Sequence, residues 1–163
     1  MQREMLQDAA MADIHTDPPR ISSARPEMTR AIMDKTGLDQ GMLTDLVHRF
    51  YGKVRADAVL GPVFASRITE WEPHLERMVA FWSSVALMTG QYHEAPVPAH
   101  AHLPVTRLHF DHWLSLFRET ANETCPPAGA AHVIERAERI ACSLHMAVED
   151  TARANLKTIP NLR

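Results

Sequence analysis

Apolar residues recur with helical spacing through much of the chain. Between residues 40 and 58 they fall at the i, i+3, i+4 and i+7 positions of one helical face, and Asp39 is placed to cap the helix. The same spacing predicts a helix over residues 69–89, where Thr69 and Glu72 match the pattern of a capping box. We therefore expect two amphipathic helices in the first half of the chain.

The second half of the chain predicts two more helices. Thr106 can cap a helix that carries apolar residues as far as Phe117, and a long final helix is expected from about Ala131. Residues 91–105 contain three prolines and are too broken for a long helix, and residues 126–129 are expected to form a loop. Because no run of alternating polar and apolar residues predicts a strand, the fold class is all-α.

The 163 residues are enough for one domain with a sizeable core. Residues 1–26 are polar and carry three prolines, so we expect a flexible N-terminal tail there. The predicted domain occupies residues 27–154, and residues 155–163 are expected to form a short C-terminal tail.

Charge and composition narrow the possible functions. The net charge of -3 gives no basic field for a nucleic-acid backbone, and no apolar stretch approaches the ~20 residues of a membrane-spanning helix. The first residues lack a signal-peptide core, which favours a cytoplasmic protein. Cys125 and Cys142 are too few and too far apart for a disulfide scaffold or a CxxC motif, and Cys142 is expected to be a small core residue.

Ten histidines are the unusual feature of the composition. Five of them fall in or near the proline-broken segment, where they could bind zinc or copper or could simply be solvated: His93, His100, His102, His109 and His112. His15, His132 and His145 are expected to be ordinary surface or helix-flank residues. The chain contains none of the glycine-rich phosphate-binding motifs or nucleophile elbows that would indicate a nucleotide site or a hydrolase.

Three further residues indicate a functional site only when they are considered together. Separately, Tyr51 reads as a tyrosine at the core edge, His74 as a boundary histidine and Trp113 as plain core. An apolar pocket walled by helices, with a histidine in a broken segment facing these three polar groups, would suit a haem. A haem site is therefore the leading interpretation, and a haem-free histidine metal site is the alternative.

The chain resembles the third group of the truncated, two-over-two haemoglobins. The likeness covers roughly residues 28–150 and is carried by three blocks in the family's order: LVHRFYGKVRADAVLGPVF (Leu46–Phe64), WEPHLERMVAFW (Trp71–Trp82) and SSVALMTGQYHEAPVPAHAHLPVTRLHFDHWLSLF (Ser83–Phe117). The glycine-pair motifs of the other truncated groups are missing. The resemblance implies a globin-like fold, a truncated two-over-two helical sandwich around a haem b.

The resemblance also implies the roles of individual residues. His100 matches the proximal ligand of the haem iron, with His102 as its close competitor, and the following Leu103-Pro104 favours His100. The remaining matches form the distal side of the pocket: Tyr51 with Phe50 beside it, His74, Met78, Trp82 and Trp113.

The function implied by this resemblance is reversible binding of O₂, CO or NO at iron, with Tyr51, His74 and Trp113 stabilising the bound ligand. The alternative is a haem-dependent redox enzyme, either an NO dioxygenase or a peroxidase-like enzyme. An enzyme of this kind would need a separate reductase, because the chain has no evident flavin or NAD domain. Whether His74 itself ligates the iron stays open at this stage.

Overall fold

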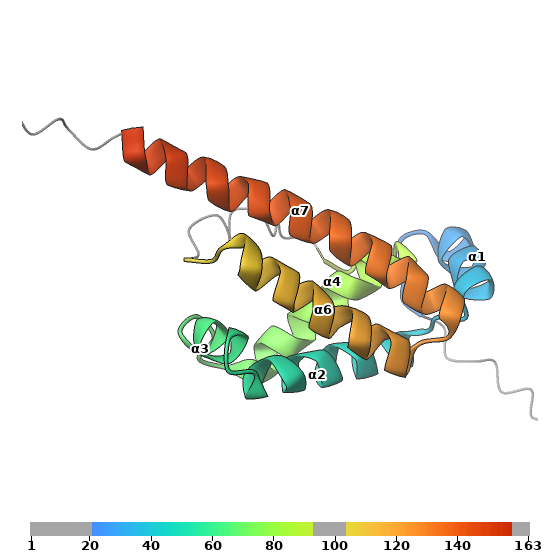
Figure 1. Ribbon diagram of the computed structural model, residues 1–163. Helices are drawn as coiled ribbons and strands as arrows, with labels where there is room; N and C mark the ends of the chain where they lie inside the picture. Colours follow the sequence, from blue (N-terminus) through green and yellow to red (C-terminus); the bar gives the residue numbers. More distant parts are fainter. Residues whose placement is uncertain (1–20, 93–103, 158–163) are drawn as a thin grey trace, which may run out of the picture.

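In the computed structural model, residues 21–92 and 104–157 are described, and all regular structure within them is helical. This confirms the predicted all-α class. The helices, labelled as in Figure 1, are α1 (Pro26–Thr36), α2 (Gln40–Ala56), α3 (Leu60–Ala65), α4 (Trp71–Leu87), α6 (Arg107–Thr124) and α7 (Pro127–Lys157).

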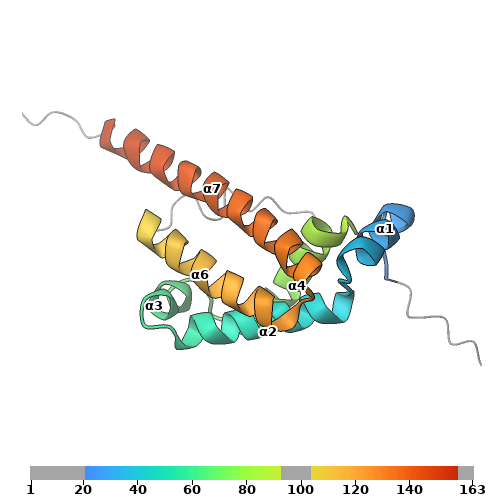
Figure 2. The same cartoon turned by 45° about the vertical axis from the view of Figure 1, so that its right-hand side comes forward.

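The four longer helices form two stacked pairs. Helix α2 packs against α4, helix α6 packs against α7, and the two pairs meet through contacts of α2 with α6 and of α4 with α7. Figures 1 and 2 show α6 and α7 side by side from both directions, with α1 at one end of the body and the C-terminal part of α7 extending beyond the other. This arrangement is the predicted two-over-two sandwich.

Helix α2 follows its sequence pattern closely. The carboxylate of Asp39 accepts a hydrogen bond from the backbone N–H of Met42 at 2.8 Å, which confirms the predicted N-cap. The apolar face is buried as expected: Leu43, Leu46, Val47, Phe50, Tyr51 and Val54. Helical periodicity alone therefore places Phe50 and Tyr51 on the inner side of the fold.

The start of α4 differs from the prediction. The capping box of Thr69 and Glu72 is wrong, because the helix begins at Trp71 and its N-cap is Glu70, whose side chain makes no capping hydrogen bond. In this register the third helical residue is Pro73, which has no side-chain acceptor to complete a capping box. The first turn of α4 is consequently held by packing and not by a cap.

Helix α6 begins where the sequence predicts. Thr106 is its N-cap, and the Nδ1 atom of His109 accepts a hydrogen bond from the Thr106 backbone N–H at 3.0 Å. A histidine thus takes the part that glutamate usually plays in a capping box. This pairing commits the Nδ1 side of His109 to the start of the helix.

Helix α7 corrects two expectations. The loop predicted over residues 126–129 is largely wrong, since the helix already begins at Pro127, a position in the first turn where proline needs no N–H partner. Cys142 is exposed and is not a core residue, because the neighbouring Ala141 occupies the inward position. At the other end α7 continues to Lys157.

The C-terminal end of α4 is fastened from both sides. The Nε2–H group of His132 on α7 donates to the carbonyl of Ala86 at 2.8 Å, and the hydroxyl of Thr29 on α1 donates to the carbonyl of Leu87 at 2.7 Å. Met88 then ends the helix in the left-handed region, with φ 56°. Two carbonyls that a helix end leaves without intrahelical partners are thereby satisfied by distant segments.

An aromatic stack joins the two helix pairs. Phe117 on α6 is 1% exposed, and its ring stacks on Trp82 of α4 with centroids 4.8 Å apart. Phe117 also stacks on Trp113, with ring centroids 5.5 Å apart, and Phe50 of α2 meets the rings of Trp113 and Phe117 edge-on. Burying aromatic side chains of this size contributes roughly 2–3 kcal/mol each, so this stack is a main support of the fold.

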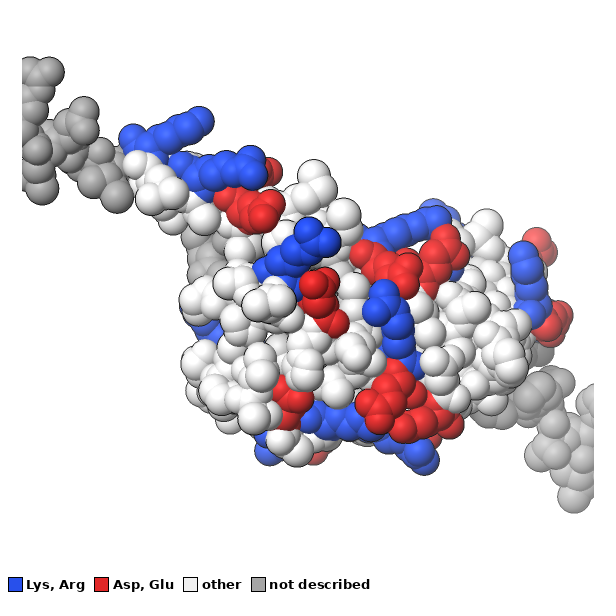
Figure 3. All heavy atoms as spheres, viewed as in Figure 1, with Lys and Arg blue, Asp and Glu red and all other residues white. Residues whose placement is uncertain are grey.

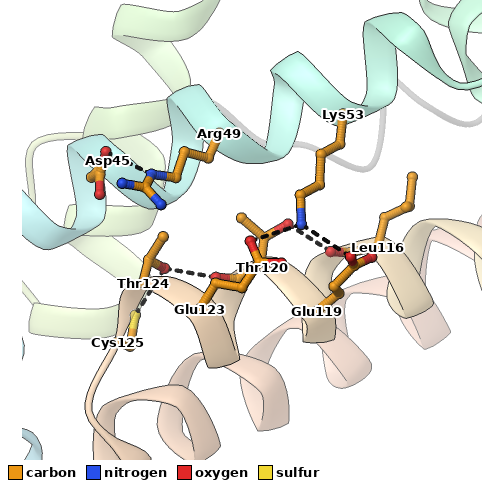
Figure 4. A network of polar contacts seen from close by, with 9 residues as sticks. All are labelled: Asp45, Arg49, Lys53, Leu116, Glu119, Thr120, Glu123, Thr124 and Cys125. Carbon is orange, nitrogen blue, oxygen red and sulfur yellow. Dashed lines mark hydrogen bonds and ion pairs between the residues drawn. The ribbon is translucent and has the colours of Figure 1, made fainter.

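The surface carries charges of both signs. On the face seen in Figure 3, basic and acidic side chains alternate without a large patch of either. Close to this surface, Lys53 of α2 reaches Glu119 and Glu123 of α6 at 3.4 and 2.9 Å, as Figure 4 shows. No helix among the described residues is long and apolar enough to cross a membrane.

Candidate functional site

A cavity of about 460 Å³ opens between the two helix pairs. Its walls are mostly apolar and come from α2, α3, α4, α6, α7 and the segments next to them. The lining residues are Tyr51, Leu60, Val63, Phe64, Arg67, Ile68, His74, Arg77, Met78, Phe81, Trp82, Tyr92, Val105, His109, Phe110, Trp113, Ile140, Ala141 and Leu144. A cavity of this size and lining is typical of a cofactor site.

Tyr51 and His74 form a polar corner in this cavity. Their rings meet edge-on, with centroids 5.1 Å apart. Tyr51 is only 6% exposed, and within the described part of the chain its hydroxyl has no hydrogen-bond partner. Burial raises the pKa of Tyr51 well above its usual range, so the phenol stays protonated and remains a donor.

The Nε2 atom of His74 is buried as well, although the residue as a whole is only partly covered. The side chain therefore points inward, from the first turn of α4 toward the cavity. An imidazole in this position can donate or accept a hydrogen bond, depending on its tautomer.

Trp113 brings a third polar group to the same cavity, from α6. Its ring meets Phe50 edge-on at 5.3 Å, and Phe50 in turn meets Tyr51 at 5.1 Å. Phe50 is 1% exposed and is not among the described lining residues, so it lies one layer behind Tyr51 and Trp113. The three sequence-predicted polar residues thus line one cavity, and the buried ring of Phe50 joins Tyr51 to Trp113.

Met78 and Trp82 also line the cavity, one and two turns after His74 on α4. The spacing of four residues keeps all three on one helical face, as the sequence predicts. Helix α4 therefore supplies one continuous wall.

The sequence-predicted iron ligand, His100, lies outside the described residues, as do His93 and His102. Described residues on both sides of this segment line the cavity: Tyr92 before it and Val105 after it. The chain consequently enters and leaves the histidine-bearing segment at the cavity.

The sequence reasoning missed the two arginines of the cavity, Arg67 and Arg77. Both are exposed at the cavity, and neither forms an ion pair within residues 21–92 and 104–157. Arg77 stands three residues after His74 and so shares its helical face, a signal that could have found it. Arg67 follows α3 in a turn, where no helical periodicity could indicate its position.

Within the described residues, His109 and His112 have separate partners. His109 is bonded to Thr106, while the Nε2 atom of His112 lies 2.6 Å from the carboxylate of Asp57. The pKa of Asp57 is lowered, first by the backbone N–H of Leu60 and then by His112. Among the described residues no three histidine, cysteine or carboxylate groups gather as a metal site would require.

Comparison with known proteins fits this architecture. No family model matches the chain. The chain is 33% identical over 109 residues to the group 3 truncated haemoglobin ctb of Campylobacter jejuni. The aligned region spans 64% of this chain and 86% of that protein. The crystal structure of the group III truncated haemoglobin from Campylobacter jejuni superposes with a TM-score of 0.65 at 31% identity, covering 68% of this chain and 91% of the other.

The fold and its cavity are therefore those of a globin, in the shortened two-over-two form. Because the aligned residues are 33% identical and cover 86% of the relative, the chain belongs to the group 3 truncated haemoglobins, a family of haem-binding globins.

Proposed function

We propose that the chain binds haem b in the 460 Å³ cavity and reversibly binds O₂, CO or NO at the haem iron. The observation that carries this proposal is the hydroxyl of Tyr51, a residue that is only 6% exposed and lines the largely apolar cavity of a truncated globin. Within the described part of the chain this hydroxyl has no hydrogen-bond partner. It can therefore donate a hydrogen bond to a group bound in the cavity.

The residues present fit a haem in three respects. Apolar side chains from five helices can cover the flat macrocycle. Arg67 and Arg77 are cations without a carboxylate partner among the described residues, and they suit the two anionic propionates. His100 belongs to the segment between the two cavity residues Tyr92 and Val105, which supports it as the axial ligand.

The bound haem supplies an iron that takes a diatomic ligand. The protein's part is then to hold that ligand by hydrogen bonds. Tyr51 stays protonated because of its burial, and Trp113 carries an N–H group that can only donate. Together with His74 they offer up to three donors to a partially negative ligand atom, in a site with few polar walls.

The test is an absorption spectrum of the purified protein as isolated, reduced with dithionite, and reduced under CO. A Soret band that shifts with CO, and that is lost or altered in His100→Ala, supports haem, its axial ligand and an open ligand side together. His102→Ala is the matched control, since it removes the neighbouring histidine, and its spectrum should stay as in the wild type. A colourless protein that binds zinc stoichiometrically even after incubation with haem would instead favour the histidine metal site.

The polar corner also supports a second candidate, a redox reaction of bound O₂. Firm retention of O₂ by several donors is poor for delivery but suits NO dioxygenation, in which NO and O₂ with one electron give nitrate. Repeated turnover requires that a separate reductase supply an electron each time. Measuring nitrate over many turnovers, with NO, O₂ and an electron donor supplied, would decide the matter, because a simple binder can supply at most one electron per protein and then stops.

A further inference from the structure

The contacts between α2 and α4 beside the polar corner form two successive pairs. The inner pair is Tyr51 with His74, and the outer pair is Arg55 with Trp71. Tyr51 and Arg55 stand four residues apart and share a face of α2. Trp71 and His74 stand three residues apart and share a face of α4. The outer pair thus directly follows the inner one toward the surface.

Trp71 touches both members of the inner pair without lining the cavity. Its ring meets His74 edge-on at 5.8 Å with an interplanar angle of 90°, and it lies 6.0 Å from the ring of Tyr51. On its outer side the guanidinium of exposed Arg55 lies 4.6 Å from the centre of the indole ring. A cation in this position holds the indole face by electrostatic attraction.

The first turn of α4 has little else to fix it. The N-cap Glu70 makes no capping hydrogen bond, and Trp71 is the first residue of the helix. The ring of Trp71 is therefore the part of this turn that packs against α2 next to His74. If His74 were to turn outward between α2 and α4, its imidazole would have to pass the indole.

We propose that Trp71, held by Arg55, is a positioning residue that keeps His74 directed into the cavity and so limits the passage of ligands beside it. The inference deepens the proposed haem function and rests on it. Trp71 itself does not touch the ligand, so its influence on ligand entry must run through His74.

A double-mutant cycle on CO association tests this route. Trp71→Ala should raise the association rate constant at least about fivefold, a coupling usual for residues in contact. In a His74→Ala background the same substitution should change the rate by less than about twofold. An equal change in both backgrounds, or no change in either, overturns the proposal, because Trp71 would then act independently of His74 or not at all.

Two milder variants keep the test usable if Trp71→Ala folds poorly. Arg55→Gln removes the cation without altering the core and should raise the CO rate in the same direction by a smaller factor. Its matched control is Arg49→Gln, an exposed arginine of the same helix that pairs with Asp45 and should leave the rate unchanged. Trp71→Phe keeps an aromatic ring and should retain a rate near that of the wild type. An Arg55→Gln rate equal to that of the wild type contradicts the role of the cation.

A second readout needs no haem. Diethyl pyrocarbonate modifies accessible imidazoles, and mass analysis of peptides from the haem-free protein gives the rate at each histidine. Trp71→Ala should speed modification of His74, whose Nε2 atom is buried, and leave that of His145 on α7 unchanged. An unaltered His74 rate overturns the inference, whereas failure of the protein to bind haem or CO at all would contradict the proposed function instead.

Discussion

Replacing Tyr51 with phenylalanine isolates one hydroxyl group of the cavity. The ring keeps its edge-on contacts with Phe50 at 5.1 Å and with Phe64 at 6.0 Å, so packing should be preserved. Because the hydroxyl has no hydrogen-bond partner within the described part of the chain, the free energy of unfolding of the haem-free protein should change by less than about 1 kcal/mol.

Ligand dissociation should respond much more strongly. A hydrogen bond from a buried phenol to a partially charged ligand atom is worth about 1.5–3 kcal/mol. Losing it should speed O₂ dissociation by about tenfold to a hundredfold. The donors of His74 and Trp113 remain at the same cavity, so we expect a value toward the lower end of this range.

The assay is stopped-flow displacement of O₂ by excess CO, followed in the Soret region. Tyr92→Phe is the matched control, since Tyr92 is the only other tyrosine of the chain and also lines the cavity. Its ring contacts Phe81 at 5.1 Å, and the substitution should leave O₂ dissociation within about twofold of the wild type.

Two results would refute the reasoning. An O₂ dissociation rate in Tyr51→Phe equal to that of the wild type removes the tyrosine from ligand stabilisation. A fall of more than about 2 kcal/mol in the unfolding free energy would mean that the hydroxyl stabilises the fold through a bond to the protein.

Three further changes test the fold around the cavity. Gly129→Ala places a Cβ 2.7 Å from a methyl carbon of Leu38 and should lower the unfolding free energy by about 1–3 kcal/mol in urea titration; no loss would mean that α7 shifts freely. Burial holds the pKa of His132 below its ordinary 6.5, so the folded state resists a proton that the unfolded chain accepts, and stability falls as the pH drops through 6.5. His132→Gln should make the Tm less dependent on pH between about pH 5 and 8, and it should also weaken the hydrogen bond to the carbonyl of Ala86. If the Tm of the variant and of the wild type change equally with pH, the assignment to His132 is contradicted. Asp57→Ala removes hydrogen bonds from two backbone N–H groups at the start of α3 and should lower the Tm, and an unchanged Tm would show that α3 needs no such cap.

Periodicity predicted the long helices well because their inner faces are apolar. Helix α1 illustrates the limit of that signal. Its two buried residues are Thr29 and Thr36, and the apolar residues between them that pack against the core, Ile32 and Met33, are only partly buried. The inner face of PEMTRAIMDKT is therefore half polar, and its apolar pattern is short. Thr29 is buried because its hydroxyl finds the carbonyl of Leu87, a partner 58 residues away that no local pattern announces.

The candidate site was likewise predicted from the sequence only in part. The sequence analysis grouped Tyr51, His74 and Trp113 from the residues themselves, and the family resemblance then gave them distal roles. The structure brings the three to one cavity. The roles given to them, and to His100 outside the described residues, stay predictions. The contact of Arg55 with Trp71 could not be foreseen, because it depends on how closely α2 and α4 approach each other in space.

The unequal fastening of the two ends of α4 has a consequence for local unfolding. The last turns carry the buried residues Trp82 and Ala86, and His132 and Thr29 hold their terminal carbonyls, whereas the first turn has no cap. The part of a helix with fewer buried contacts opens at a lower free-energy cost. Amide hydrogens of the His74-bearing turns should therefore exchange with solvent before those near Ala86, and this partial opening would uncover the cavity while the rest of the fold stays intact.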